Sequence, residues 1–134
     1  MIEVREMIRD DFSSVSSLIE EAFGIRRVNF LCSSNQTELV AYYGDVLGYL
    51  LLTRFYDPIK NQVYFKVDYV CVRKTSRGQG IGKLLMNTVY EIACKEKASY
   101  IELTSGYSRT AARKMYESLG YVCRESNIFR KVIL

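Results

Sequence analysis

The chain contains no histidine, and its four cysteines are scattered through 134 residues. No two of them form a Cys-x-x-Cys pair, so the ligand spacing of a zinc site is missing and we expect no metal. Cys71 and Cys94 stand among apolar residues. That setting is typical of buried, reduced thiols, and it favours a cytoplasmic location over one in which disulfides form.

Long apolar runs are also missing. The run at residues 49–52 is far short of the ~20 residues that cross a bilayer, so we expect no membrane partner. Glu3, Arg5 and Glu6 interrupt the N-terminus, which predicts no secretory leader. The net charge of +4 is too mild to indicate nucleic acid as a partner. The length and the hydrophobic content of 49% predict one soluble domain, residues 1–134.

Apolar residues recur with strand and helix periods in alternation, which predicts an α/β fold with a mixed sheet flanked by helices. Gly24 closes the first predicted helix, and Pro58, the only proline, falls in a turn. Residues 25–36 have no clear period and are expected to form a helix or a loop. The predicted strands are residues 2–7, 37–43, 46–56, 62–73 and 100–103, with one or two more in 121–134, and the predicted helices are residues 12–23, 81–93 and 109–119.

Three glycines at alternate positions, Gly78, Gly80 and Gly82, follow a strand-like run that ends at Val72. Glycines admit close approach of a ligand, and the amides of a helix N-terminus attract anions, so we expect a phosphate-bearing ligand. The loop of nucleotide hydrolases is excluded because it needs four residues between its first and last glycine, not three. The dinucleotide fingerprint is excluded because its sixth position is Lys83. A purely structural turn stays the alternative.

Residues 77–82, Arg-Gly-Gln-Gly-Ile-Gly, resemble the acetyl-coenzyme A loop of the GNAT superfamily of N-acetyltransferases. Residues 108–121 resemble the second diagnostic segment of that family. In this segment Tyr116 is followed by Gly120 and Tyr121, where the family has glycine and an aromatic residue four and five positions after its tyrosine. The two segments stand in the family's order and at about its separation, so together they are far more specific than either alone.

The resemblance implies the GNAT fold, a mostly antiparallel mixed sheet whose two central strands splay after a bulge, flanked by helices. It also implies acetyl-CoA as cosubstrate, with strand backbone pairing with the pantetheine arm and the glycine loop cradling the pyrophosphate. Arg109 stands where many relatives have asparagine; an arginine there can reach phosphates or an anionic substrate group. The expected cofactor-binding residues are Val70, Cys71, Val72, Arg77, Gly78, Gln79, Gly80, Ile81, Gly82, Lys83 and Arg109.

Two catalytic residues are implied by position. Tyr116 is expected to protonate the departing thiolate, because a phenol with a pKa of about 10 matches a thiol better than a carboxylate does. A tyrosine that only packs its helix is the alternative. Asp68 stands where some relatives place an acid that contacts the amine through water; strand alternation puts Val70 and Val72 on its face. A direct role and a structural or solvated one stay open for Asp68, and Glu102 and Glu20 are lesser candidates.

The function implied is an acyltransferase that moves acetyl from acetyl-CoA to a primary amine of a small molecule or peptide. A protein lysine or N-terminal acetyltransferase is the second hypothesis, and a non-catalytic acyl-CoA-binding module the third. With 11 tyrosines, the chain offers more aromatic surface than a small domain readily buries. We therefore expect a homodimer with the hairpin of residues 37–56 near its interface.

Overall fold

The computed structural model describes residues 1–106 and 108–134. These residues form two compact units, Met1–Thr104 and Ser105–Leu134, and each is described by itself. The prediction that the whole chain is one domain stays a prediction. Within the described residues no helix is long and apolar enough to cross a membrane.

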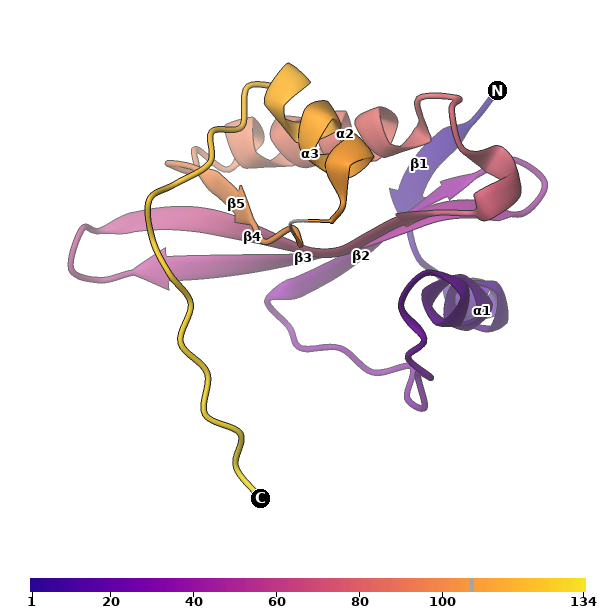
Figure 1. Ribbon diagram of the computed structural model, residues 1–134, viewed down its shortest axis with the longest axis horizontal. Helices are drawn as coiled ribbons and strands as arrows, with labels where there is room; N and C mark the ends of the chain where they lie inside the picture. Colours follow the sequence, from indigo (N-terminus) through magenta and orange to yellow (C-terminus); the bar gives the residue numbers. More distant parts are fainter. Residues whose placement is uncertain (107) are drawn as a thin grey trace. The chain divides into compact units, whose positions relative to one another are not determined.

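The first unit is a five-stranded mixed sheet with a helix on each side (Figure 1). The strands follow one another across the sheet in chain order; β4 and β5 pair in parallel, and the other neighbours pair antiparallel. The elements are β1 (Glu3–Glu6), α1 (Phe12–Phe23), β2 (Gln36–Tyr42), β3 (Val46–Asp57), β4 (Gln62–Val72), α2 (Ile81–Lys95) and β5 (Ile101–Leu103). This confirms the predicted class, an α/β fold with helices flanking a mixed sheet.

Helix α1 covers one face of the sheet, called here the α1 face. Its side chains Val15, Leu18 and Ile19 are buried in one cluster with side chains from β2, β3 and β4. The helix ends as the sequence predicted: Gly24 adopts a left-handed φ of 68°, and its N–H donates to the carbonyl of Glu20 at 2.9 Å.

Helix α2 covers the opposite face, the α2 face. Its residues Ile81, Leu85, Met86 and Val89 are almost completely buried. The helix approaches β3 so closely at Gly48 that an added Cβ would lie 2.9 Å from Ile81 Cγ2 and 3.0 Å from Leu85 Cδ1. A side chain at position 48 would therefore force Ile81 or Leu85 to shift.

Among its described residues the second unit contains one helix, α3 (Thr110–Ser118). Gly120, two residues after the end of this helix, has a φ of 90°. The prediction of one or two strands in residues 121–134 is wrong, because the structure gives this segment no regular secondary structure. The alternation of apolar residues in this segment is not sufficient to form a strand. A strand also needs a hydrogen-bonding neighbour, and the unit Ser105–Leu134 contains no strand among its described residues.

The prediction of two buried thiols is correct for Cys71 and wrong for Cys94, which is exposed. Ala93, the preceding residue of α2, is buried against the sheet. One residue further along a helix rotates the side chain by about 100°, which carries Cys94 out of the core.

Candidate active site

Strand β4 contains the bulge that the resemblance implied. Tyr49 pairs with Cys71 and Leu51 pairs with Asp68, so that two residues of β4 lie opposite the single residue Leu50. The ladder between β4 and β5 covers only Phe65–Val67 and Ile101–Leu103. Since β4 continues five residues beyond this ladder, the edge of residues 68–72 extends past its neighbour and presents backbone groups that β5 does not pair.

The bulge also decides which way the side chains of β4 point. Asp68 lies opposite Leu51, which packs against the core of the α1 face, whereas Val72 lies opposite Gly48, which faces α2. The expectation that Asp68 and Val72 share a face is therefore wrong, because the extra residue shifts the alternation by one position. Asp68 is half-buried on the α1 face, and Cys71 is buried in the core of that same face.

The glycine loop connects this strand edge to α2. Gly78 and Gly80 have φ values of 82° and 77°. Residues other than glycine rarely adopt a backbone conformation in this region. A Cβ added at either position would meet no atom within 4 Å. These glycines are therefore not required by close packing within the chain, and the space beside them can admit a ligand.

Helix α2 begins directly after the loop, and its first helical hydrogen bond runs from the Leu84 N–H to the Gly80 carbonyl. The amides of residues 81–83 precede that bond and point out of the helix N-terminus, where the helix dipole favours an anion. Arg77 and Lys83 are exposed and add positive charge, and Gln79 is exposed beside them. Ile81 is buried, so only its backbone can serve a ligand.

Arg73, which sequence reasoning missed, fastens the start of the loop. Its backbone N–H donates to the Leu47 carbonyl at 2.7 Å and its Nε to the Val46 carbonyl at 3.1 Å. A guanidinium directly after a strand is the only local signal of this role. These contacts hold the start of the loop against the first residues of β3 and so fix the direction in which the chain leaves β4.

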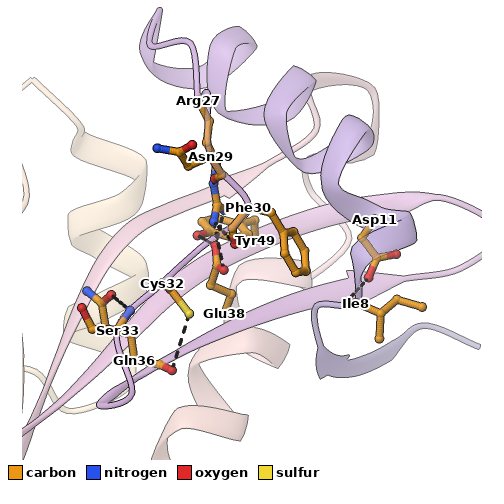
Figure 2. Close-up of polar contacts among 10 residues, drawn as sticks. All are labelled: Ile8, Asp11, Arg27, Asn29, Phe30, Cys32, Ser33, Gln36, Glu38 and Tyr49. Atoms are coloured by element: carbon orange, nitrogen blue, oxygen red, sulfur yellow. Dashed lines mark hydrogen bonds and ion pairs between the residues drawn. The ribbon is translucent and has the colours of Figure 1, made fainter.

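Of the segment 25–36, residues 25–35 form an irregular loop and Gln36 begins β2. An ion pair between the half-buried Arg27 and the buried Glu38 holds this loop against β2 (Figure 2). The guanidinium of Arg27 binds the carboxylate of Glu38 and donates to the carbonyl of Asn29 at 2.7 Å. The Tyr49 hydroxyl donates to Glu38 Oε1 at 2.6 Å, and burial, followed by this bond, raises the pKa of Tyr49. Sequence reasoning missed this network, although a glutamate within an otherwise apolar strand was a signal for it.

Tyr116 is the only buried residue of α3. Burial raises the pKa of its hydroxyl, and nearby Arg109 partly offsets this effect. Its ring packs edge-on against Tyr121 with centroids 6.1 Å apart. A raised pKa keeps the phenol protonated at neutral pH, as a proton donor requires. Both Tyr116 and Arg109 belong to the unit Ser105–Leu134, so their place beside the glycine loop stays a prediction.

The lesser candidates Glu20 and Glu102 are both exposed, in agreement with a solvated role. Among residues 1–106 and 108–134, no group of three histidine, cysteine, aspartate or glutamate side chains is arranged to hold a metal ion.

A mixed sheet with a bulged strand, an extended strand edge and a glycine loop that opens the next helix defines the fold class of the acetyltransferases. The chain belongs to the Acetyltransferase (GNAT) family, whose model matches residues 2–121. This family uses acetyl-CoA, the cosubstrate that the resemblance implied.

The chain is similar in sequence to the catalytic subunit of the N-terminal acetyltransferase B complex of Arabidopsis thaliana, with 40% identity over 68 residues. That match covers 50% of this chain and 36% of the relative's length.

Two solved structures show a similar fold. One is a transcriptional regulator from Bacillus halodurans, with a TM-score of 0.87, 21% identity and coverage of 98% of this chain and 100% of that one. The other is a ribosomal-protein-alanine N-acetyltransferase from Brucella melitensis biovar Abortus, with a TM-score of 0.84, 18% identity and coverage of 98% and 99%.

Proposed function

We propose that this protein transfers an acetyl group from acetyl-CoA directly to a primary amine of a small molecule or peptide. The observation that carries the proposal is the continuity of two binding elements. The edge of β4 beyond Val67 can pair with an extended chain, and the N-terminus of α2, reached through the glycine loop, can bind an anion. Pantetheine and pyrophosphate are joined in coenzyme A in that same order.

The residues present fit this cosubstrate, because the space beside Gly78 and Gly80 is open and basic side chains flank it. When bound, acetyl-CoA supplies an acetyl group already activated as a thioester. The backbone of residues 70–72 would pair with the pantetheine arm, and the amides of residues 77–82 would receive the pyrophosphate. Arg77, Lys83 and Arg109 would add positive charge.

The chain's own catalytic groups then have a limited task, since a thioester needs little activation. Asp68, on the α1 face beside the β4 edge, would attract the cationic amine and take up its proton through water. Tyr116 would give its hydroxyl proton to the departing sulfur. Its raised pKa supports this role, because the proton is still present at neutral pH.

The second hypothesis is acetylation of a protein lysine or a protein N-terminus. The names of two similar proteins, an N-terminal acetyltransferase subunit and a ribosomal-protein-alanine N-acetyltransferase, favour a peptide or protein N-terminus. A non-catalytic module that only binds acyl-CoA is the remaining alternative. Such a module would bind acetyl-CoA and release no thiol with any amine.

The proposal is tested by calorimetric titration with acetyl-CoA, followed by a screen of polyamines, aminoglycosides, amino acids and peptides read by free-thiol release. We expect acetyl-CoA to bind and at least one amine to accelerate thiol release. Peptides alone as active acceptors would select the N-terminal or lysine hypothesis. Absence of acetyl-CoA binding by the folded protein would contradict the proposal as a whole.

We also propose that the protein is a cytoplasmic homodimer. Tyr43 in the β2–β3 turn and Tyr56 near the end of β3 remain more than half exposed, which supports an aromatic interface around this hairpin. Light scattering at micromolar concentration should give twice the mass of one chain, and the mass of one chain would remove the dimer from the proposal.

A further inference from the structure

Tyr69 holds a strained backbone conformation in the middle of β4. Its φ is 57°, and the other described residues with positive φ that are not glycine, Asn61 and Lys97, lie in turns. The left-handed region is unfavourable for a tyrosine because its Cβ approaches the backbone, so such a conformation persists only where the surrounding structure imposes it. Residues held in this way concentrate at functional sites.

The bulge directs the ring of Tyr69 to the α1 face. The ring packs edge-on against Phe23, the last residue of α1, with centroids 5.5 Å apart and planes at 81°. Asp68 points to that same face, as its pairing with Leu51 shows. In a regular strand two successive side chains would lie on opposite faces. The bulge therefore places a phenol and a carboxylate on the same face of the sheet beside the strand edge.

Tyr69 is free to bind a ligand with its hydroxyl. The residue is 45% exposed, and among the described residues no hydrogen bond is made by its hydroxyl. The packing against Phe23 orders the ring without using the polar end. An ordered aromatic ring with an unused hydroxyl is suited to recognise a ligand, because little conformational entropy is lost on contact.

The face of the sheet on which Tyr69 lies indicates which ligand its hydroxyl can bind. The N-terminus of α2, assigned to the anionic end of acetyl-CoA, belongs to the helix on the α2 face. An acceptor that must reach the same β4 edge while the cosubstrate is bound can approach from the α1 face. We propose that Tyr69 contacts the acceptor and determines its specificity, with its hydroxyl bound to a cationic amine next to the Asp68 carboxylate. This inference rests on the proposed function.

The test compares Tyr69→Phe and Tyr69→Gly with wild type, using an amine found in the acceptor screen. Tyr69→Phe should raise the acceptor KM about three- to tenfold, the loss expected for one hydrogen bond, and leave the acetyl-CoA Kd within about twofold. Tyr69→Gly should raise the acceptor KM further. It should also unfold at nearly the wild-type temperature, since relief of strain offsets the lost ring contact.

Two control variants make the same kinds of change as the Tyr69 variants, but at positions outside the proposed acceptor site. Lys97→Gly relieves a similar backbone strain in a turn, and Tyr90→Phe removes a hydroxyl from the exposed side of α2. Both should leave the acceptor KM and the acetyl-CoA Kd unchanged. A control that changed the acceptor KM as much as Tyr69→Phe would overturn the assignment, because the effect would not be specific to Tyr69.

The outcomes separate this inference from the proposed function. If wild type binds no acetyl-CoA or acetylates no amine, the proposed function fails and the role of Tyr69 fails with it. If wild type is active and both Tyr69 variants keep its acceptor KM, only the role of Tyr69 is overturned. An equal rise in acetyl-CoA Kd and acceptor KM would also overturn it, because Tyr69 would then act on the cosubstrate edge.

Discussion

Replacement of Gly80 by aspartate tests the anion site most directly. The added carboxylate would lie at the N-terminus of α2, in the space that we assign to the pyrophosphate. Two like unit charges about 5 Å apart, at an effective dielectric constant of about 20, repel by about 3 kcal/mol. This repulsion alone should raise the acetyl-CoA Kd more than about a hundredfold.

Strain complicates this change, because Gly80 has a φ of 77° and any side chain there costs up to about 1–2 kcal/mol of folding stability. Gly24→Asp is a matched control: Gly24 has a φ of 68°, has similarly open surroundings and terminates α1 rather than starting α2. Both variants should unfold at lower temperature than wild type. Only Gly80→Asp should lose affinity for acetyl-CoA.

A second control separates charge from size. Gly80→Asn has nearly the same shape as Gly80→Asp without the negative charge, so its affinity should fall between wild type and the aspartate variant. Calorimetric titration of each variant, at a temperature where circular dichroism shows it folded, provides the measurement. Wild-type affinity in the folded Gly80→Asp protein would refute the assignment of the loop and place the acetyl-CoA site elsewhere.

Two further predictions concern single side chains. Tyr116→Phe should bind acetyl-CoA almost normally and lose about 10²–10⁴-fold in kcat if the phenol is the general acid; a lowered melting temperature with unchanged kcat would show that the hydroxyl only anchors its helix. The hydrogen bond from Arg5 lowers the pKa of the buried Asp11 carboxyl. The pair therefore stabilises the fold at any pH above the unfolded-state pKa of about 4. This stabilisation is lost as the pH falls through the lower folded-state pKa. Asp11→Asn should therefore cost about 1–3 kcal/mol at pH 7 and much less near pH 2, as measured by urea unfolding; an equal cost at both pH values would contradict the pairing.

The order of elements could be read from the sequence because it depends on local patterns. Apolar spacing placed α1 and α2, and Gly24 marked the end of α1 since a helix commonly ends with a residue in the left-handed conformation. The glycine loop was equally local, because its chemistry depends on a few consecutive backbone groups. The family followed from two such segments in a fixed order.

Other features needed contacts between residues distant in the chain. Arg27 and Glu38 are eleven positions apart and meet only because an irregular loop folds back over β2. No helix or strand period in the sequence therefore predicts their ion pair. Residues 121–134 are the reverse case, in which a local pattern is present but the predicted structure does not form. Their alternation is strand-like, yet a strand also needs a hydrogen-bonding neighbour that no local pattern provides.

The sequence by itself therefore determined the family, the approximate bounds of the helices and most strands, and the place of the expected anion site, because each depends on residues close together in the chain. The tertiary structure alone decided how β4 passes through the sheet. Val67 must fill the core beneath α2 while Cys71 fills the core beneath α1, and an uninterrupted strand would turn both to one face. The bulge at Tyr69 lets both side chains reach their own cores. It also turns Asp68 and Tyr69, which we assign to the acceptor, to the α1 face.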